Sequence, residues 1–135
     1  MNKKLQLKNL CPCGTNLDYK NCCGQWHDNQ SNHYLKAPSA EQLMRSRYSA
    51  FVLKLEQYLL DTWHANTRPQ SLDFTNDNTK WLGLTIISKS QQNDTNATVE
   101  FIAKNKVGGK SCNIYENSSF VLEGGIWLYV AENKG

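Results

Sequence analysis

Four cysteines lie within thirteen residues near the N-terminus, in two pairs, Cys11 with Cys13 and Cys22 with Cys23. Structural zinc sites are tetrahedral, with thiolate sulfurs about 2.3 Å from the metal. Two close pairs joined by a short loop can fold back to supply all four ligands. So short a segment cannot bury a core, and metal binding would supply most of its folding free energy, on the order of 10 kcal/mol. The sequence therefore predicts a structural zinc site with these four cysteines as ligands.

Residues around the two pairs favour the same arrangement. Pro12 fixes its own φ angle and stiffens the first pair. Gly14 suits a tight turn whose free backbone N–H groups point at the thiolate sulfurs. Lys8 and Lys20 are placed to reduce the local negative charge.

Other interpretations of the cluster stay open. Disulfide pairing is one, although adjacent cysteines rarely bond each other without strain. His27 in place of one cysteine is a second. A redox or nucleophilic role is a third, but a closed site of fully ligated thiolates has no open position for chemistry. The fifth cysteine, Cys112, lies in a strand-like segment, where we expect a small buried residue.

The composition describes one globular domain with a small appendage. The chain has 135 residues, 39% hydrophobic and 20% charged, with a formal charge of +3. Four thiolates around a dication would bring this charge to about +1. Only three of the fifteen basic residues are arginine. This balance argues against specific nucleic-acid binding and leaves weak RNA contact through the cysteine segment as the lowest-ranked hypothesis.

The chain carries no sign of a membrane span or a secretion signal. No apolar run approaches the roughly 20 residues that cross a bilayer. The basic N-terminus is not followed by the apolar region of a signal peptide. We therefore expect a cytoplasmic protein, a compartment in which clustered cysteines bind metal more often than they form disulfides.

The residues after the cysteine segment predict helices and then strands. Ser39 followed by Gln42 fits a helix capping box, and apolar residues then recur at helical spacing as far as Trp63, with a break near residues 53–55 allowed. From residue 81 the period becomes two. The predicted strands are residues 81–90, 97–107, 110–122 and 126–132. The glycine pairs at 108–109 and 124–125 fit two-residue hairpin turns.

These elements predict an α+β fold class, with N-terminal helices packed on one face of a four-stranded antiparallel sheet. The expected divisions are a zinc knuckle at residues 1–27, a polar linker at 28–38 and the α+β domain at 39–135. We call residues 1–27 the knuckle.

Glu116 is the titratable residue of this domain that most invites a function. Period two places it on the same strand face as Ile114 and Phe120. A carboxylate there must be paired or shifted in pKa. The preferred interpretation is a structural ion pair, because Arg45 or Arg47 of the predicted helix could reach it. The alternative is an acid or base in a pocket.

Further side chains would form such a pocket. The candidate assistants in proton transfer are Tyr48, Tyr58 and His64, and the candidate walls are Trp63, Trp81 and Trp127. His64 also fits a simpler role as a capping or partly exposed histidine at the helix end. No nucleophile elbow, phosphate loop or paired-histidine metal helix is present in the sequence.

The cysteine segment resembles the SEC-C motif, the zinc-binding tail of the SecA translocation ATPase. The resemblance rests on the Cys-Pro-Cys-Gly start, on Tyr19-Lys20, and on the Cys-Cys-Gly ending. Thr15 and Asn16 stand where serine and glycine are usual. The resemblance implies bound zinc and docking on a protein or ribosome-associated partner.

Residues 41–129 resemble the uncharacterised YchJ-like bacterial proteins, which join this domain to an N-terminal SEC-C motif. The shared positions include residues 43–51, 58–59, 62–64, 81–84, 101–104 and 108–110, with Glu116, Ser118, Phe120, Trp127 and Tyr129. The resemblance implies a nuclear transport factor 2-like cone, in which helices pack on a curved sheet that often encloses a pocket. Ala65 and Ala131 replace the family's usual proline and aspartate.

Two functions follow from the sequence as hypotheses. The first is a non-enzymatic zinc-binding adaptor, whose knuckle docks on a partner while the main domain binds a small ligand or scaffolds the contact. The second is a small-molecule enzyme that uses Glu116 as an acid or base. The sequence names no substrate, partner or oligomeric state.

Overall fold

The computed structural model describes residues 9–133, which form one helical layer against a four-stranded sheet. The helices are η1 (Tyr19–Asn21), α2 (Cys23–His27), α3 (Ala40–Leu53) and α4 (Glu56–Asp61). The strands are β1 (Lys80–Gln91), β2 (Asn96–Val107), β3 (Lys110–Glu123) and β4 (Ile126–Glu132). The sheet is antiparallel in the order β1-β2-β3-β4. The predicted meander and α+β fold class are confirmed, with strand ends within one residue of those expected.

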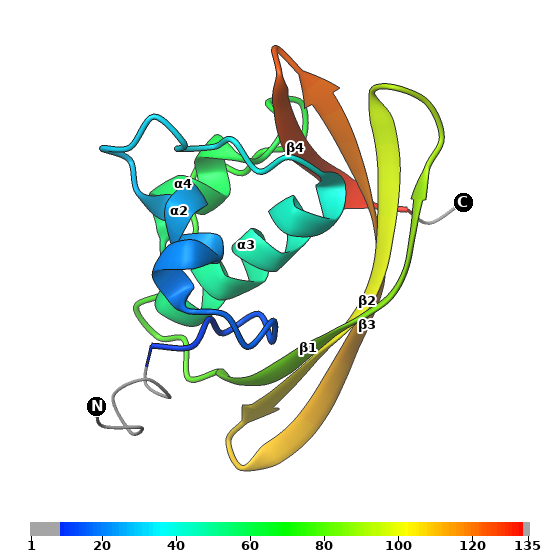
Figure 1. The fold of residues 1–135 in the computed structure, drawn as a ribbon. Helices are drawn as coiled ribbons and strands as arrows, with labels where there is room; N and C mark the ends of the chain where they lie inside the picture. The colour runs from blue at the N-terminus through cyan, green and yellow to red at the C-terminus, as the bar shows by residue number, and fades with distance from the viewer. Residues whose placement is uncertain (1–8, 134–135) are drawn as a thin grey trace.

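The sheet is held in register by its hairpin turns and by the alternation of its side chains. All four glycines of the two predicted turns have positive φ angles, between 58° and 83°, which side chains disfavour. On β2, Ala97, Val99, Phe101 and Ala103 are buried. They face α3, which lies across the concave side of the curved sheet (Figure 1).

The helical segment begins and breaks where the sequence indicates. The Ser39 hydroxyl accepts a hydrogen bond from the Gln42 backbone N–H at 3.1 Å, which caps α3. The reverse contact of the capping box, from the Gln42 side chain, is not formed among the described residues. α3 ends at Leu53 and is capped by Lys54, which has a left-handed backbone (φ 60°, ψ 47°), and α4 follows after Leu55.

The cysteine segment and the predicted linker both pack against the main domain. Figure 1 shows α2 beside α3. Tyr34 and Leu35 of the linker pack on a second apolar cluster that contains Tyr58 and Leu59. The Tyr34 hydroxyl also donates to Asp61 at 2.7 Å. The boundaries at residues 27 and 38 stay predictions, but the two parts are joined by packing as well as by the chain.

Cys112 was expected to be buried, and this prediction is wrong, because its thiol is exposed. It lies opposite Asn105 near the tip of the β2–β3 hairpin. Asn105 itself is only 3% exposed, so the inner face is covered over β2 but not over Cys112 on β3, which β4 flanks only from Ser118 onward. Among residues 9–133, no helix is long and apolar enough to cross a membrane.

Candidate functional site

The four clustered cysteines converge on one point. Their Sγ atoms all lie within 4.8 Å of one another, and those of Cys13 and Cys22 are 3.6 Å apart. In a tetrahedral site with metal–sulfur bonds of about 2.3 Å, neighbouring sulfurs are about 3.8 Å apart. Cys11, Cys13 and Cys23 are buried, and Cys22 is partly exposed. These residues therefore fit a single metal ion, and as free thiols they are not paired in disulfides.

Two glycines allow the backbone to bring the pairs together. Gly14 has a φ of +92°, and its N–H donates to the Cys11 carbonyl at 3.4 Å. That bond confirms the tight turn, although the N–H points at an oxygen and not at a sulfur. Gly24 packs against Tyr19 so closely that a Cβ atom would lie 2.6 Å from the Tyr19 carbonyl oxygen and 2.9 Å from its ring. A side chain at position 24 would separate α2 from η1.

The thiols influence one another's protonation. Hydrogen bonds from the Cys13 and Cys23 thiols lower the pKa of Cys11, and the pKa of Cys23 is raised mainly because it donates to Cys11. Burial raises the pKa of Cys22 to about 11. The thiolate of Cys11 is thus favoured, while Cys22 and Cys23 keep their protons. Four thiolates at these distances require a cation to compensate their charge.

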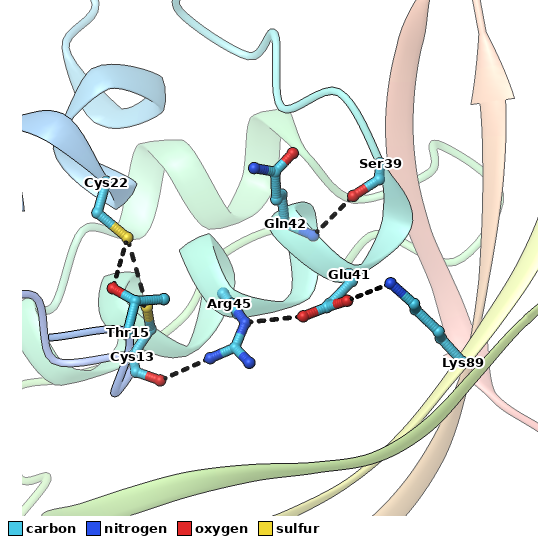
Figure 2. Close-up of polar contacts among 8 residues, drawn as sticks. All are labelled: Cys13, Thr15, Cys22, Ser39, Glu41, Gln42, Arg45 and Lys89. Atoms are coloured by element: carbon cyan, nitrogen blue, oxygen red, sulfur yellow. Dashed lines mark hydrogen bonds and ion pairs between the residues drawn. The ribbon is translucent and has the colours of Figure 1, made fainter. Parts of the chain in front are cut away.

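Polar side chains beyond the cysteines support the cluster. The Thr15 hydroxyl lies 3.2 Å from Cys22 Sγ, and the Ser49 hydroxyl of α3 lies 3.5 Å from Cys11 Sγ. Arg45 donates to the Cys13 carbonyl at 3.0 Å and pairs with Glu41 at 3.1 Å (Figure 2). Arg45 was a candidate partner for Glu116, but it faces the knuckle instead.

Of the two lysines expected to reduce the negative charge, Lys20 is exposed and Lys8 lies outside the described residues. The cationic group held against the knuckle is Arg45, which the sequence did not single out for this role. Ser49 was missed as well. Only the one-turn spacing of these residues on α3, four positions apart, could have suggested that they share a neighbour.

His27 anchors α2 to α3 and is directed away from the thiols. Its Nε2 bonds to the Ser46 carbonyl oxygen at 2.8 Å, and its Nδ1 to the Tyr19 hydroxyl at 2.6 Å. The ring also packs edge-on against Tyr58, with centroids 4.5 Å apart. Because both ring nitrogens are engaged, the geometry gives no support to His27 as a replacement ligand.

A second feature is a cavity of about 350 Å³ between α3 and the sheet. Its walls are predominantly aromatic and aliphatic, with one arginine and one glutamate among them. The lining residues are Met44, Arg47, Tyr48, Phe51, Trp63, Trp81, Phe101, Ala103, Ile114, Glu116, Ser118 and Tyr129. This volume is in the range of small-molecule sites.

Within the described residues, neither candidate arginine forms an ion pair with Glu116. The Oε2 atom of Glu116 accepts hydrogen bonds from the hydroxyls of Ser118 at 2.5 Å and Tyr129 at 3.0 Å. Arg47 is only 3% exposed and donates through Nη1 to the Leu59 carbonyl at 2.8 Å and the Thr62 hydroxyl at 2.7 Å.

The guanidinium of Arg47 also lies over two aromatic rings. Its central carbon is 4.8 Å from the centre of the Trp63 ring and 4.6 Å from that of Tyr129. Burial lowers the pKa of Arg47 to about 10. The side chain therefore remains a cation at neutral pH, enclosed at the wall of the cavity.

The other candidates divide between the cavity and separate positions. Tyr48, Trp63 and Trp81 line the cavity with Glu116, and burial raises the pKa of Tyr48. Three others lie elsewhere: His64 pairs with Glu123 at 2.8 Å near the surface, Tyr58 bonds to Ser46 at 2.7 Å, and Trp127 is a buried core residue. The geometry therefore associates Tyr48, but not His64, with Glu116.

Comparison with known proteins identifies both parts of the chain. A family model of the middle, NTF2-like domain of YchJ matches residues 39–132. A SEC-C motif model matches residues 8–25. The chain belongs to the YchJ family. Both resemblances seen in the sequence are thereby confirmed, together with the fold class.

YchJ-family relatives are similar over almost their whole length. A UPF0225 protein of Bordetella pertussis is 51% identical over 120 residues, which cover 89% of each chain. Another from Chromobacterium violaceum is 42% identical over 135 residues, which cover 97% of each chain. Their names assign no activity.

Two solved structures share the fold of this YchJ-family chain. One is the crystal structure of a SEC-C motif-containing protein from Psychrobacter arcticus, with a TM-score of 0.76 and 30% identity over 93% of this chain and 82% of the other. The second is the solution structure of a SEC-C motif-containing protein from Rhodopseudomonas palustris, with a TM-score of 0.78 and 30% identity over 92% and 97%. The likeness extends over both the knuckle and the main domain.

Proposed function

We propose that the protein is a non-enzymatic adaptor whose knuckle holds a structural zinc ion and docks on a protein or ribosome-associated partner, while the main domain binds a small ligand or scaffolds the contact. The observation that carries this proposal is the convergence of the four thiols inside the apolar core that the knuckle shares with α3 and the sheet. A metal held by these four ligands would fix the surface of the knuckle relative to the main domain. It would have no open coordination position for a reaction.

Zinc is the proposed metal because four thiolates in tetrahedral spacing suit it. Bound zinc would supply charge compensation and four fixed bonds. The ligands must stay reduced, so the proposal places the protein in the cytoplasm. Metal analysis of freshly purified, reduced protein is expected to give one zinc per chain. The exposed-cysteine variant Cys112→Ser should keep it and Cys13→Ser should lose it. A content near zero in the unmodified protein would overturn the assignment.

The docking surface proposed is a groove of about 430 Å³ between the knuckle and the end of α3. It is lined by Asn9, Leu10, Pro12, Asp18, Tyr19, Lys20 and Leu53. Leu53 is 44% exposed. Leu17, which directly precedes the groove residue Asp18 in the chain, is 52% exposed. The polar rim and apolar side chains of this groove are features of protein-contact sites. The partner class comes by analogy with SEC-C motifs.

A double variant tests docking without touching the metal. Leu17→Ser with Leu53→Ser removes exposed apolar groups, so folding and zinc content should be unchanged. The control is Leu82→Ser, an equally exposed leucine (56%) on β1. Co-sedimentation with ribosomes and pull-down from bacterial extract should show partners lost only with the double variant. Equal recovery with all three proteins would refute the docking proposal.

A second candidate function is supported by the position of Glu116. Its Oε2 carries both hydroxyl contacts, and no described residue bonds its Oε1, so this oxygen is free to exchange a proton with a molecule in the cavity. Tyr48 is the candidate assistant in the same cavity. The enzyme hypothesis predicts that Glu116→Gln folds normally but abolishes a measured turnover. Unchanged turnover would exclude it.

A further inference from the structure

The cavity between α3 and the sheet contains a buried cation with unused hydrogen-bond donors. A guanidinium has five N–H groups. In Arg47 those on Nη1 bond to Leu59 and Thr62, and no described residue accepts from Nε or Nη2. The free edge is thus the one that presents two parallel N–H groups, the geometry that matches a planar acceptor such as a carbonyl or carboxylate.

Glu116 supplies the opposite chemistry in the same cavity. Its Oε1 has no partner among the described residues, so it can accept one more hydrogen bond. Tyr129 connects the two groups, since its ring lies under the Arg47 guanidinium and its hydroxyl donates to Glu116. The cavity therefore has a donor edge and an acceptor atom on neighbouring walls.

The charges of the two groups select a neutral ligand. Arg47 and Glu116 together contribute no net charge, and the other lining residues are uncharged. An anionic ligand would be attracted by Arg47 but repelled by Glu116. A cationic ligand would be attracted by Glu116 but repelled by Arg47. Burying a charged ligand in this apolar cavity is costly unless its charge is compensated. A neutral molecule with one acceptor and one donor can form hydrogen bonds with both Arg47 and Glu116.

The remaining walls select a flat, apolar body. Tyr48, Phe51, Trp63, Trp81 and Phe101 line the cavity with Tyr129, and aromatic side chains favour stacked or edge-to-face contacts with a ring. An adjacent acceptor and donor on a ring is the pattern of a cyclic amide, in which C=O and N–H lie on the same side.

We propose that this cavity binds a small, neutral aromatic lactam, whose carbonyl accepts from the free edge of Arg47 and whose N–H donates to Glu116. The inference rests on the part of the proposed function that gives the main domain a small ligand, and it is independent of docking through the knuckle. It assigns Arg47 and Glu116 as the specificity-determining pair.

Three related compounds test the inference. 2-Quinolone carries the lactam edge, N-methyl-2-quinolone lacks the donor, and 2-naphthoate is an anion of similar size. Binding is followed by the indole N–H signals in ¹H–¹⁵N spectra of the full chain. Trp63 and Trp81 line the cavity, whereas Trp26 and Trp127 do not and serve as internal references. We expect saturable shifts of Trp63 and Trp81 with 2-quinolone, and at least tenfold weaker binding of the other two, because an unpaired buried group rejects the wrong analogue.

A charge-removing variant separates the roles of the two walls. Glu116→Gln keeps an oxygen to accept from Ser118 and Tyr129, so folding should be retained. The variant should bind 2-quinolone at least tenfold more weakly and 2-naphthoate more tightly than the unmodified protein does. Glu100→Gln, on the outer sheet face, is the matched control and should change neither affinity.

Equal affinities for the three compounds, or no shift of Trp63 and Trp81 with 2-quinolone, would overturn the lactam inference. Either result would leave the docking proposal intact, because the groove variants are scored by partner recovery alone. Loss of partner recovery in those variants with normal 2-quinolone binding would support both. The ligand titration and the partner-recovery experiment therefore test the two proposals independently.

Discussion

His27 is half-buried, and its hydrogen bonds fit the neutral ring. Its Nε2 must carry the proton, because the atom facing it is the Ser46 carbonyl oxygen, so Nδ1 accepts from the Tyr19 hydroxyl. Burial lowers the pKa of His27 from its usual 6.5, although the bond to Ser46 opposes this shift. The charge of Cys11 also opposes the shift, but burial of the ring, which packs edge-on against Tyr58, outweighs both. Protonation would add a second donor opposite the Tyr19 hydroxyl.

The lowered pKa of His27 predicts a dependence of stability on pH. A histidine whose pKa is lower in the folded chain than in the unfolded chain binds fewer protons when folded. The free energy of unfolding therefore falls as the pH drops below about 6.5. His27→Gln should unfold more easily at pH 7.5, yet lose less additional free energy of unfolding between pH 7.5 and 5.5 than the unmodified protein loses. Urea unfolding at both pH values measures this difference.

The control for this prediction is His33→Gln, at an exposed histidine. Loss of metal at low pH affects all three proteins and cancels in the comparison. A pH dependence of His27→Gln as steep as that of the unmodified protein would show that His27 is not responsible.

Single residues were predictable where a local pattern decides their environment. The spacing of the cysteines identified the metal cluster, and strand alternation placed Glu116 on the inner face. The same alternation gave Cys112 the inner face but wrongly implied burial, because its neighbour Asn105 on β2 is covered while this part of β3 is not. Likewise, the sequence showed that Arg45 and Arg47 flank the helix stripe, but not that one faces the knuckle and the other lies over aromatic rings.

At the scale of elements, α3 joins the two sites. Arg45, Ser46 and Ser49 meet the knuckle, while Arg47 and its neighbours line the cavity. The helix is therefore buried on its polar side as well as its apolar side. A periodic pattern predicted that the helix exists and which side meets the sheet. It could not predict the knuckle as a second neighbour, because small polar residues have the same appearance on a solvent-exposed face.

The end of α3 gives a prediction for this element. Lys54 adopts a left-handed conformation, which costs a non-glycine residue about 1 kcal/mol. Glycine is the usual residue at this position of a helix end. Lys54→Gly should therefore raise the free energy of unfolding by about 0.5–1 kcal/mol, as measured by urea unfolding.

Lys54→Ala provides the matched control for that change. Both variants remove the exposed contact between the Lys54 amine and the Asp77 carbonyl, but alanine keeps the backbone strain. Alanine should give no stabilisation, so the difference between the variants reports the backbone alone. Equal stabilities for the two variants would contradict a strained helix end.

At the scale of the whole molecule, the knuckle and the main domain share one core. Cys11, Cys13 and Cys23 belong to the same apolar cluster as Phe120 and Trp127 of the sheet. The sequence suggested a short module tied to the domain by a linker, because its segments are separated by polar residues. Long-range packing of this kind leaves no periodic signal, so only the three-dimensional arrangement reveals it.

This shared core predicts that removing the metal weakens the whole chain. A ligand present at about 1,000 times its dissociation constant stabilises the folded state by about 4 kcal/mol. Chelation under reducing conditions should therefore lower the thermal midpoint by about 10 °C or more, in one transition. Amide hydrogen exchange should show faster exchange in β2 and β3 as well as in residues 9–38. If only residues 9–38 lost protection, the knuckle would be an independent module. Because α3 contacts both the cysteine cluster and the cavity, its cavity-lining turns should lose protection together with β2 and β3.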